Sequence, residues 1–224
     1  MSSVEEIEKI LYVDWDIPYK HYPPKVITLA SGEKMVVREA RREEVPKLLE
    51  ALRPLLTVER DYYDIVAARQ YAELLGWYRY RVRNEYCLIG VIDGYLVGIA
   101  NNRLVNQDVC MSLHTVALKR GLRIGAHMFA AKQEHAMENL GVKEIWVTAE
   151  SPIGFRRWMI EWGLEYRPDV QHELGGAKCW VLTREKYFKD VKHRLVFGER
   201  PVPEDLYKKS LDFKITTPDV LKTT

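Results

Sequence analysis

Apolar, β-rich runs separated by turn residues recur along the chain and predict three hairpins. Residues 86–92 and 95–100 flank Asp93 and Gly94, a pair that favours a tight turn between strands. Residues 26–29 and 35–38 flank Ser31-Gly32-Glu33 and predict a second hairpin. Residues 170–174 and 179–183, joined through Gly175 and Gly176, predict a third.

Two segments have the spacing of helices. Apolar residues recur at intervals of three and four over residues 43–56, with Pro46 in the first turn, where a missing N–H costs nothing. Residues 60–82 predict a second helix with six aromatic side chains, Tyr62, Tyr63, Tyr71, Trp77, Tyr78 and Tyr80. These aromatic residues are expected to pack as a core stripe or, alternatively, to line a pocket.

A strand, a helix and a second strand follow in the middle of the chain. Residues 109–118 alternate as a strand, the Ala-rich residues 126–140 are typical of a helix that stops at Gly141, and residues 144–149 form the next strand. This order predicts a right-handed crossover between parallel strands. A short helix over residues 153–162, ending at Gly163, is expected after it.

The turn that opens the helix of this crossover reads Arg120-Gly121-Leu122-Arg123-Ile124-Gly125-Ala126. A glycine-rich turn at a helix N-terminus directs unpaired backbone N–H groups and the positive end of the helix dipole at one point. This geometry suits a pyrophosphate.

Both ends of the chain lack regular periodicity. Residues 1–34 contain several aromatic residues and Pro23-Pro24, and we expect an irregular arm across the main body. Residues 186–224 gain charge and proline, so an extended tail with a loose end is predicted.

Composition narrows the class of partner. The chain has 224 residues, 47% of them hydrophobic, and its 34 basic and 32 acidic residues give a net charge of +2. This balance provides no electrostatic case for nucleic acid or membrane and favours a small molecule. The absence of a basic, then apolar, leader favours a cytoplasmic protein. Cys87, Cys110 and Cys179 are odd in number and lie in apolar runs, so we expect reduced, buried thiols.

The order hairpin, strand, arginine-glycine turn, helix, strand, short helix and hairpin resembles the GCN5-related N-acetyltransferase (GNAT) superfamily over residues 35–185. The resemblance implies an α/β fold with a central, mixed but mostly antiparallel, twisted sheet flanked by helices. It also implies that residues 120–126 hold the pyrophosphate of acetyl-coenzyme A or another acyl-coenzyme A. The acceptor would be an amine of a small molecule or peptide.

Three positions differ from the pattern of the family it resembles. Arg123 occupies the place of the central glycine of the turn, and its side chain must point away from a bound cofactor. Pro152 and Met159 occupy the places of the usual asparagine and tyrosine of the short helix. Because methionine cannot protonate a leaving thiolate, the acid would be another group, such as Tyr166 or Ser151, or solvent.

The strand before the turn is where the family's general base often projects, and here it offers His114. Alternation places His114 on one face with Cys110, Ser112 and Val116. A histidine has a pKa suited to accepting the proton of an amine, and the alternative is a half-buried structural histidine. Glu150 is the second candidate base and would need a pKa raised by burial; otherwise it caps a helix or faces solvent. A backbone N–H of residues 109–118 would hold the oxyanion.

Two functions follow from the resemblance. The first is acyl-coenzyme A dependent N-acyl transfer, with an acceptor pocket formed by residues 60–82 and the N-terminal arm. The second is a catalytically silent protein of the same fold that binds acyl-coenzyme A or a protein partner as a sensor or scaffold. No metal site is expected, since His127 and His135 lie eight residues apart without a His-Glu-x-x-His run. A homodimer is compatible with the sequence.

Overall fold

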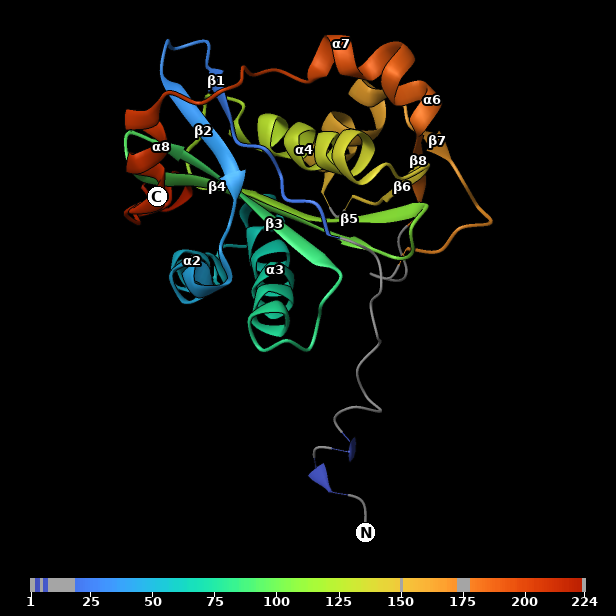
Figure 1. Cartoon of the computed structure of the whole chain (residues 1–224), viewed down its shortest axis with the longest axis horizontal. Coiled ribbons are helices and arrows are strands. Elements are labelled where there is room, and N and C mark those ends of the chain that lie inside the picture. Colours follow the sequence, from blue (N-terminus) through green and yellow to red (C-terminus); the bar gives the residue numbers. More distant parts are fainter. Residues whose placement is uncertain (1–2, 5, 8–18, 150, 173–177, 223–224) are drawn as a thin grey trace.

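The central element is one sheet of eight strands in the order β1-β2-β3-β4-β5-β6-β8-β7 (Figure 1). The structure is a computed structural model that describes residues 3–4, 6–7, 19–149, 151–172 and 178–222. Neighbouring strands are antiparallel except β5 and β6, which are parallel. The mixed, mostly antiparallel sheet agrees with the predicted fold class.

The two N-terminal hairpins form where the apolar runs predicted them. β1 (Lys25–Thr28) pairs with β2 (Lys34–Glu39), and β3 (Glu85–Ile92) pairs with β4 (Tyr95–Leu104). Asp93 and Gly94 both have positive φ, 47° and 77°. This backbone matches the twist of the strands that it joins, which is why Asp-Gly is favoured here.

Helices cover both faces of the sheet (Figure 1). On one face lie α2 (Val45–Leu52), between short 3₁₀ turns at Arg42–Glu44 and Arg53–Leu55, and α3 (Tyr63–Tyr78), which follows a 3₁₀ turn at Arg60–Tyr62. On the other face lies α4 (Ile124–Glu134), continued by the π-helical stretch η4 (His135–Leu140). Each face has its own apolar core, so the buried sheet separates two clusters of side chains.

The predicted crossover between parallel strands is confirmed. β5 (Val109–Ala117) leads through α4 to β6 (Glu144–Val147), and the helix ends at Gly141 with φ 78°. The short helix that follows consists of α5 (Pro152–Gly154) and η5 (Phe155–Ile160), and Gly163 terminates it with φ 59°. Glycine ends each of the two helices because other residues rarely adopt a positive φ.

The predicted third hairpin is wrong in its first strand. β8 (Trp180–Thr183) forms as expected, but its hairpin partner is β7 (Glu165–Tyr166). Residues 170–172 are irregular backbone after a turn at residues 168–169, while residues 173–177 lie outside the described part. β8 also pairs with β6, which makes the apolar run 179–183 an inner strand rather than an edge.

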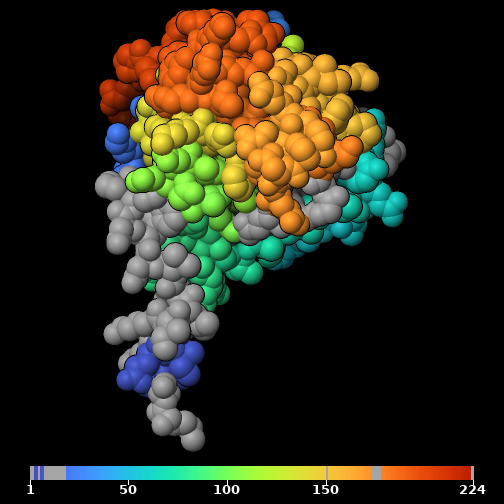
Figure 2. Space-filling model, turned by 90° about the vertical axis from the view of Figure 1, so that its right-hand side faces the viewer, coloured from blue at the N-terminus to red at the C-terminus, as the bar shows by residue number. Residues whose placement is uncertain are grey.

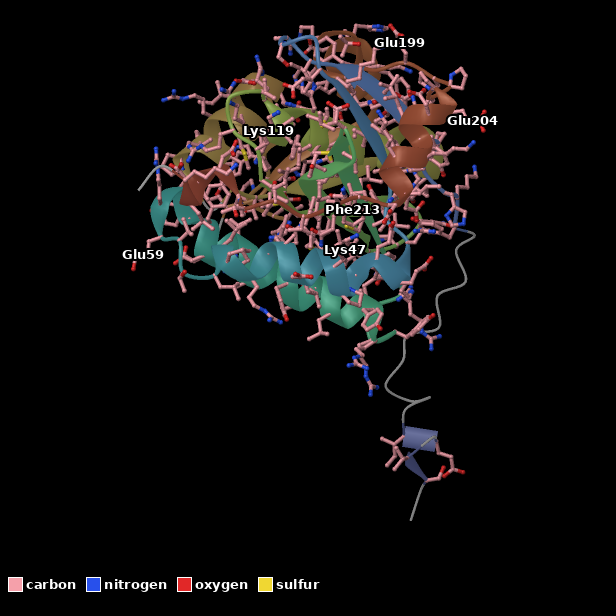
Figure 3. All side chains as sticks on the ribbon, turned by 90° about the vertical axis from the view of Figure 1, so that its left-hand side faces the viewer. Lys47, Glu59, Lys119, Glu199, Glu204 and Phe213 are labelled. Carbon is pink, nitrogen blue, oxygen red and sulfur yellow. The ribbon has the colours of Figure 1, made fainter. Side chains whose placement is uncertain are left out.

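The prediction of an extended, loose C-terminal tail is also wrong. Residues 184–222 contain α6 (Arg184–Lys186), η6 (Tyr187–Val191), α7 (Lys192–Leu195), α8 (Glu204–Leu211) and η7 (Asp219–Leu221). Phe213 and Val220 are buried in the core on the α2 and α3 face, and the Lys47 ammonium of α2 lies 4.8 Å from the Phe213 ring centre (Figure 3). Single apolar anchors, invisible to a periodicity argument, hold this segment.

The predicted arm, residues 1–34, overlaps the first hairpin, because β1 belongs to the sheet. Tyr22, just before β1, is buried, and its hydroxyl donates to Glu134 of α4. All three cysteines are buried and free, as predicted. Over the described residues, none of the helices combines the length and the apolar character that crossing a bilayer requires.

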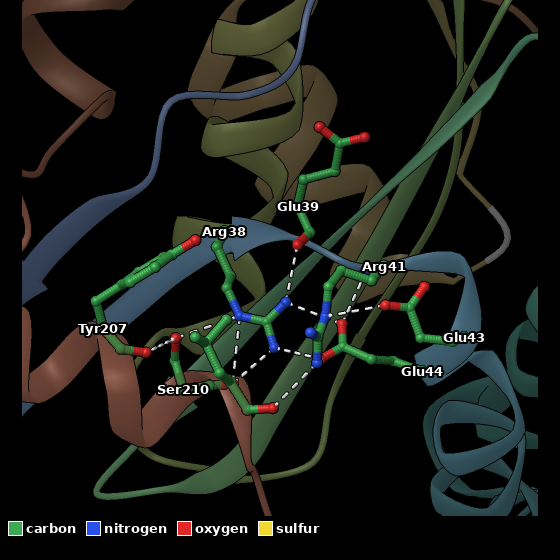
Figure 4. Close-up of polar contacts among 8 residues, drawn as sticks. Arg38, Glu39, Arg41, Glu43, Glu44, Tyr207 and Ser210 are labelled. Atoms are coloured by element: carbon green, nitrogen blue, oxygen red, sulfur yellow. Dashed lines mark hydrogen bonds and ion pairs between the residues drawn. The ribbon is translucent and has the colours of Figure 1, made fainter.

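A buried ion pair attaches α8 to the sheet (Figure 4). The guanidinium of Arg38 in β2 donates to both carboxylate oxygens of Glu44 at 2.9 and 2.6 Å and to the Ser210 carbonyl oxygen at 2.6 Å. Burial alone would raise the pKa of Glu44, but hydrogen bonds from Arg38 and Arg41 outweigh it and lower the pKa. The fully satisfied pair therefore joins β2, the start of α2 and α8.

Replacing Arg38 with methionine should destabilise the protein strongly. The Arg38→Met variant leaves the buried Glu44 carboxylate and the Ser210 carbonyl without this partner, which costs about 3 to 5 kcal/mol. Urea unfolding measures the loss. Arg41→Met is the matched control, because Arg41 also pairs with Glu44 but is half exposed, and it should cost under about 1 kcal/mol. Equal stability of the two variants would contradict the role given to Arg38.

Candidate active site

A pocket opens where β5 and β6 part. The two strands pair only from Val109 to Ser112 on β5, yet β5 continues to Ala117. Five consecutive residues of β5, 113–117, line the pocket, so the backbone of the unpaired edge forms part of its wall. Beyond Ser112 this edge has N–H and C=O groups that no strand satisfies.

A β-bulge accompanies this divergence. The register between β4 and β5 shifts between Ala100 and Asn102, which pair with Thr115 and Ser112. Cys110 consequently packs in the core on the α4 side, and Val116 packs in the core on the α3 side. The predicted alternation that placed His114 on one face with Cys110 and Ser112 is therefore wrong, because a bulge interrupts the period of two.

Two buried side chains satisfy the backbone at the bulge. Lys132 of α4 donates from Nζ to the carbonyl oxygens of Asn101 and His114, each at 3.2 Å. The side-chain oxygen of Asn101 accepts the His114 N–H at 3.2 Å, and its amide nitrogen donates to Glu85 at 2.8 Å. Both Lys132 and Asn101 are completely buried, so the bulge is held from within the core.

His114 lines the pocket as a neutral side chain. Burial, followed by the positive charge of Lys132 and Arg69, lowers its pKa to about 3. Its Nε2 atom is buried and has no hydrogen-bond partner among the described residues. The structure thus brings His114 to the pocket as predicted, but with a pKa well below the near-neutral value expected for its residue type.

The direction of the β5 amides follows from two hydrogen bonds on the β4 side. His114 N–H points to Asn101 and Leu118 N–H to the Val97 carbonyl, so alternation turns the Thr115 N–H toward the opposite, open edge. The hydroxyl of Thr115 is also buried without a partner among the described residues. The Ala117 carbonyl faces this edge too, where it accepts from the Tyr63 hydroxyl at 3.1 Å.

The glycine-rich turn closes one end of the same pocket. α4 begins at Ile124, and its N-cap residue, Arg123, makes no side-chain capping bond. The first-turn N–H groups of residues 124–126 therefore lack helical acceptors. A Cβ on Gly125 would meet only the Ala117 Cβ, at an ordinary 3.8 Å, so packing does not require this glycine, and its bare surface lines the pocket. Gly121 has φ 82°, which explains its residue type.

Both arginines of the turn are held by carboxylates from other elements. Arg123 has φ 56°, is mostly exposed, and directs its guanidinium to Glu161 at 3.3 Å, beyond η5. Arg123 lines the pocket, and its guanidinium is paired with a carboxylate of another element. Arg120 donates to Asp61 at 2.9 Å, just before α3.

The opposite walls come from α3 and from the segment after β6. Tyr62 and Tyr63 line the pocket, whereas Trp77 is buried and packs in the core, so the aromatic residues serve both predicted purposes. Figure 2 shows α3 (cyan) and the α5 segment (light orange) on the same side of the molecule. Sequence reasoning missed Arg157 and Trp158, whose only signal is a position one helical turn after α5 begins.

The residues considered as replacements for the family's acid have different positions. Ser151 lines the pocket, but its oxygen already accepts the Gly154 N–H at 3.0 Å as a helix cap. Tyr166 lies in β7, half exposed against Trp180, and is not part of the pocket wall. Met159 is buried in the core. Glu150, the second candidate base, lies outside the described residues.

No family model matches the chain, and no curated protein matches it in sequence. Solved structures do resemble it. The GNAT domain of S. lividans PAT superposes with a TM-score of 0.55 at 10% identity, covering 74% of this chain and 99% of that domain. Mycobacterium smegmatis RimJ in complex with CoA-disulfide gives a TM-score of 0.53 at 12% identity, covering 78% and 94%. Aminoglycoside acetyltransferase AAC(6')-Ib in complex with coenzyme A and kanamycin gives 0.50 at 19%, covering 70% and 99%.

These likenesses agree with the topology derived from the strand pairing. One mixed sheet contains the parallel pair β5–β6, which separates after Ser112. The turn into α4 follows the end of β5. The chain therefore has the fold of the GNAT superfamily, which the order of its elements predicted.

Proposed function

We propose that the protein transfers an acyl group from an acyl-coenzyme A, most simply acetyl-coenzyme A, to an amine. One observation carries the proposal: the unpaired edge of β5 and the free N-terminus of α4 line a single pocket. A strand edge offers hydrogen bonds to an extended amide chain, and a helix N-terminus attracts phosphate. In an acyl-coenzyme A the pantetheine arm is an extended amide chain and the pyrophosphate follows it. The two parts therefore match the strand edge and the helix N-terminus in turn.

The residues of the pocket fit such a ligand. The N–H groups of Ile124, Gly125 and Ala126 would hold the pyrophosphate, with Gly121 and Leu122 shaping the turn before them. Arg120 and Arg123 both line the pocket and add positive charge there, each paired with a carboxylate. The bare surface of Gly125 leaves the space that the phosphates need.

The acyl carbonyl would lie at the open edge of β5. When the amine nitrogen forms its bond to the acyl carbon, the carbonyl oxygen becomes an oxyanion, and the carbon–sulfur bond then breaks to release a thiolate. The Thr115 N–H, directed to this edge, is suited to stabilise the oxyanion. The site is partly buried, which strengthens this hydrogen bond relative to water.

His114 would accept the proton of the attacking amine. With a pKa of about 3 its ring is uncharged near neutral pH, and in the tautomer that carries the proton on Nδ1 the buried Nε2 is free to accept. A base this weak cannot deprotonate an ammonium ion to a useful extent. The acceptor must therefore reach the pocket as an uncharged amine, and Glu150, which follows β6 in the sequence, is the second candidate for receiving its proton.

A second function, binding of acyl-coenzyme A without transfer, is favoured by a specific observation. Met159 is buried in the core, so the position of the family's tyrosine supplies no acid to the pocket. A protein that binds the thioester without protonating the leaving sulfur would serve as a sensor or scaffold. Turnover measurements separate the two functions.

Acetyl-coenzyme A should raise the melting temperature, and Gly125→Trp should abolish the shift. At 100 times its dissociation constant a ligand adds about 2.7 kcal/mol of stability. The indole would fill the space beside the first-turn amides without disturbing the core, because Gly125 faces the pocket. Differential scanning fluorimetry measures both effects.

The matched control is Gly125→Ala, whose Cβ meets only an ordinary contact with Ala117 and should preserve most of the shift. A wild-type protein whose melting temperature does not rise with any acyl-coenzyme A would contradict the proposal. A full shift of the melting temperature in Gly125→Trp would mean that acetyl-coenzyme A binds at a different site.

The pH profile of transfer should lack an inflection near pH 6.5. Because the pKa of His114 is lowered to about 3, its protonation state stays constant from pH 5 to 8, and kcat/KM should rise with pH as the amine loses its proton. His114→Ala should lower kcat by roughly 10²-fold or more. Steady-state assays with a panel of amines measure both, with the exposed His193→Ala as control.

An inflection near pH 6.5 that disappears in His114→Ala would contradict the neutral histidine. Unchanged kcat in that variant would remove His114 from the reaction. Acyl-coenzyme A binding without turnover of any amine would favour the silent function.

A further inference from the structure

The C-terminal segment, residues 213–222, crosses the end of the sheet and reaches the glycine-rich turn at residues 120–126. Lys214 exchanges backbone hydrogen bonds with the β3–β4 hairpin, donating to the Gly94 carbonyl and accepting from the Leu96 N–H. Phe213 and Val220 are buried on either side of this crossing. The segment is thus anchored at two points, and its path between them leads from the β3–β4 turn to the end of β5.

Asp219 joins this segment to the turn through two hydrogen bonds. Its own N–H donates to the Leu118 carbonyl at 2.8 Å, and its carboxylate oxygen Oδ2 accepts the Arg120 N–H at 2.9 Å. The other oxygen accepts from Lys222 Nζ at 2.8 Å. These bonds from Lys222 and the Arg120 amide hold the pKa of the Asp219 carboxyl below its usual range, so the carboxylate is ionised at neutral pH.

Among the described residues the turn has few other backbone hydrogen bonds. Lys119 N–H bonds to Val97 at a long 3.4 Å, and the next backbone bond is His127 N–H to the Arg123 carbonyl, inside α4. Between them, two residues have positive φ, Gly121 at 82° and Arg123 at 56°. Among the described residues, the Asp219 carboxylate is the hydrogen-bond acceptor for the backbone at the start of this stretch.

Arg120 is therefore held at both ends. Asp219 fixes its backbone, and Asp61 fixes its guanidinium from the start of α3. A turn that presents N–H groups to a pyrophosphate gains affinity when its conformation is already formed before binding. The C-terminal segment supplies that order from outside the residues of the turn.

We infer that Asp219 is a positioning residue of the cofactor site and that the segment anchored by Phe213 and Val220, residues 213–220, is part of the machinery that binds acyl-coenzyme A. The inference rests on the proposed function. Asp219 touches no ligand. It sets the conformation of residues 120–123, which places the first-turn amides of α4.

The test compares two ligands in Asp219→Ala. Coenzyme A contains the pyrophosphate that the turn would hold, and S-acetylpantetheine lacks it and reaches only the β5 edge. Loss of a charge-assisted bond to the Arg120 N–H should weaken coenzyme A by about tenfold. The affinity for S-acetylpantetheine should stay at the wild-type value. Isothermal titration calorimetry measures the first and competition with acetyl-coenzyme A the second.

Two variants control for the fold. Asp219→Asn keeps an oxygen that can accept from Arg120 and should restore much of the affinity. Lys222→Met removes the partner of the other oxygen without touching the turn and should bind coenzyme A like the wild type. Hydrogen exchange gives a readout that needs no ligand: in Asp219→Ala the Arg120 amide should exchange faster, while the β3 and β4 amides keep their protection.

Equal affinity of wild type and Asp219→Ala for coenzyme A would overturn the inference, as would an equal loss for both ligands, which indicates general unfolding. Unchanged exchange at Arg120 would also overturn it. A wild-type protein that binds neither ligand would instead refute the proposed function, and the exchange measurement would still decide whether Asp219 orders the turn.

Discussion

The arrangement of this site depends on one buried ammonium group. Lys132 reaches from α4 into the core and donates to the carbonyl oxygens of Asn101 and His114, which the β4–β5 ladder leaves without strand partners at its bulge. Burial lowers the pKa of Lys132 to about 7. Without this donor two buried carbonyls would be unsatisfied, at a cost of about 1 to 3 kcal/mol each. With it, the bulge persists, and His114 lies on the α3 face.

The bulge and the parting of β5 from β6 occur at the same residues. Ser112 is the last residue of β5 that pairs with β6, and its carbonyl accepts from the Nε2–H of the buried His172 at 3.1 Å. Polar side chains from three elements thus complete the hydrogen bonds of a strand that leaves its neighbour. The open edge that results is usable by a ligand because the backbone around it is already satisfied.

Carboxylates organise the basic side of the pocket in the same indirect way. Three carboxylates each bind an arginine of the turn: Asp61 just before α3, Glu161 just after η5, and Asp219 in the C-terminal segment. These contacts join residues that are 38, 59 and 99 positions apart in the sequence. They pair both guanidinium groups of the turn with carboxylates, and Gly125 and Ala126 in the first turn of α4 line the pocket beside them.

The sequence by itself determined the elements of the middle of the chain and their order. The Asp93-Gly94 hairpin, the β5–α4–β6 crossover and the glycine-rich turn depend on local spacing and turn chemistry, and these agree with the structure. Tertiary contacts decided the rest. The face of His114 depends on a bulge, its low pKa on burial beside Lys132, and the tail on single anchors such as Phe213. Such effects come from residues that are distant in sequence. The desolvation of a side chain and its pairing with a partner occur only once the chain has folded.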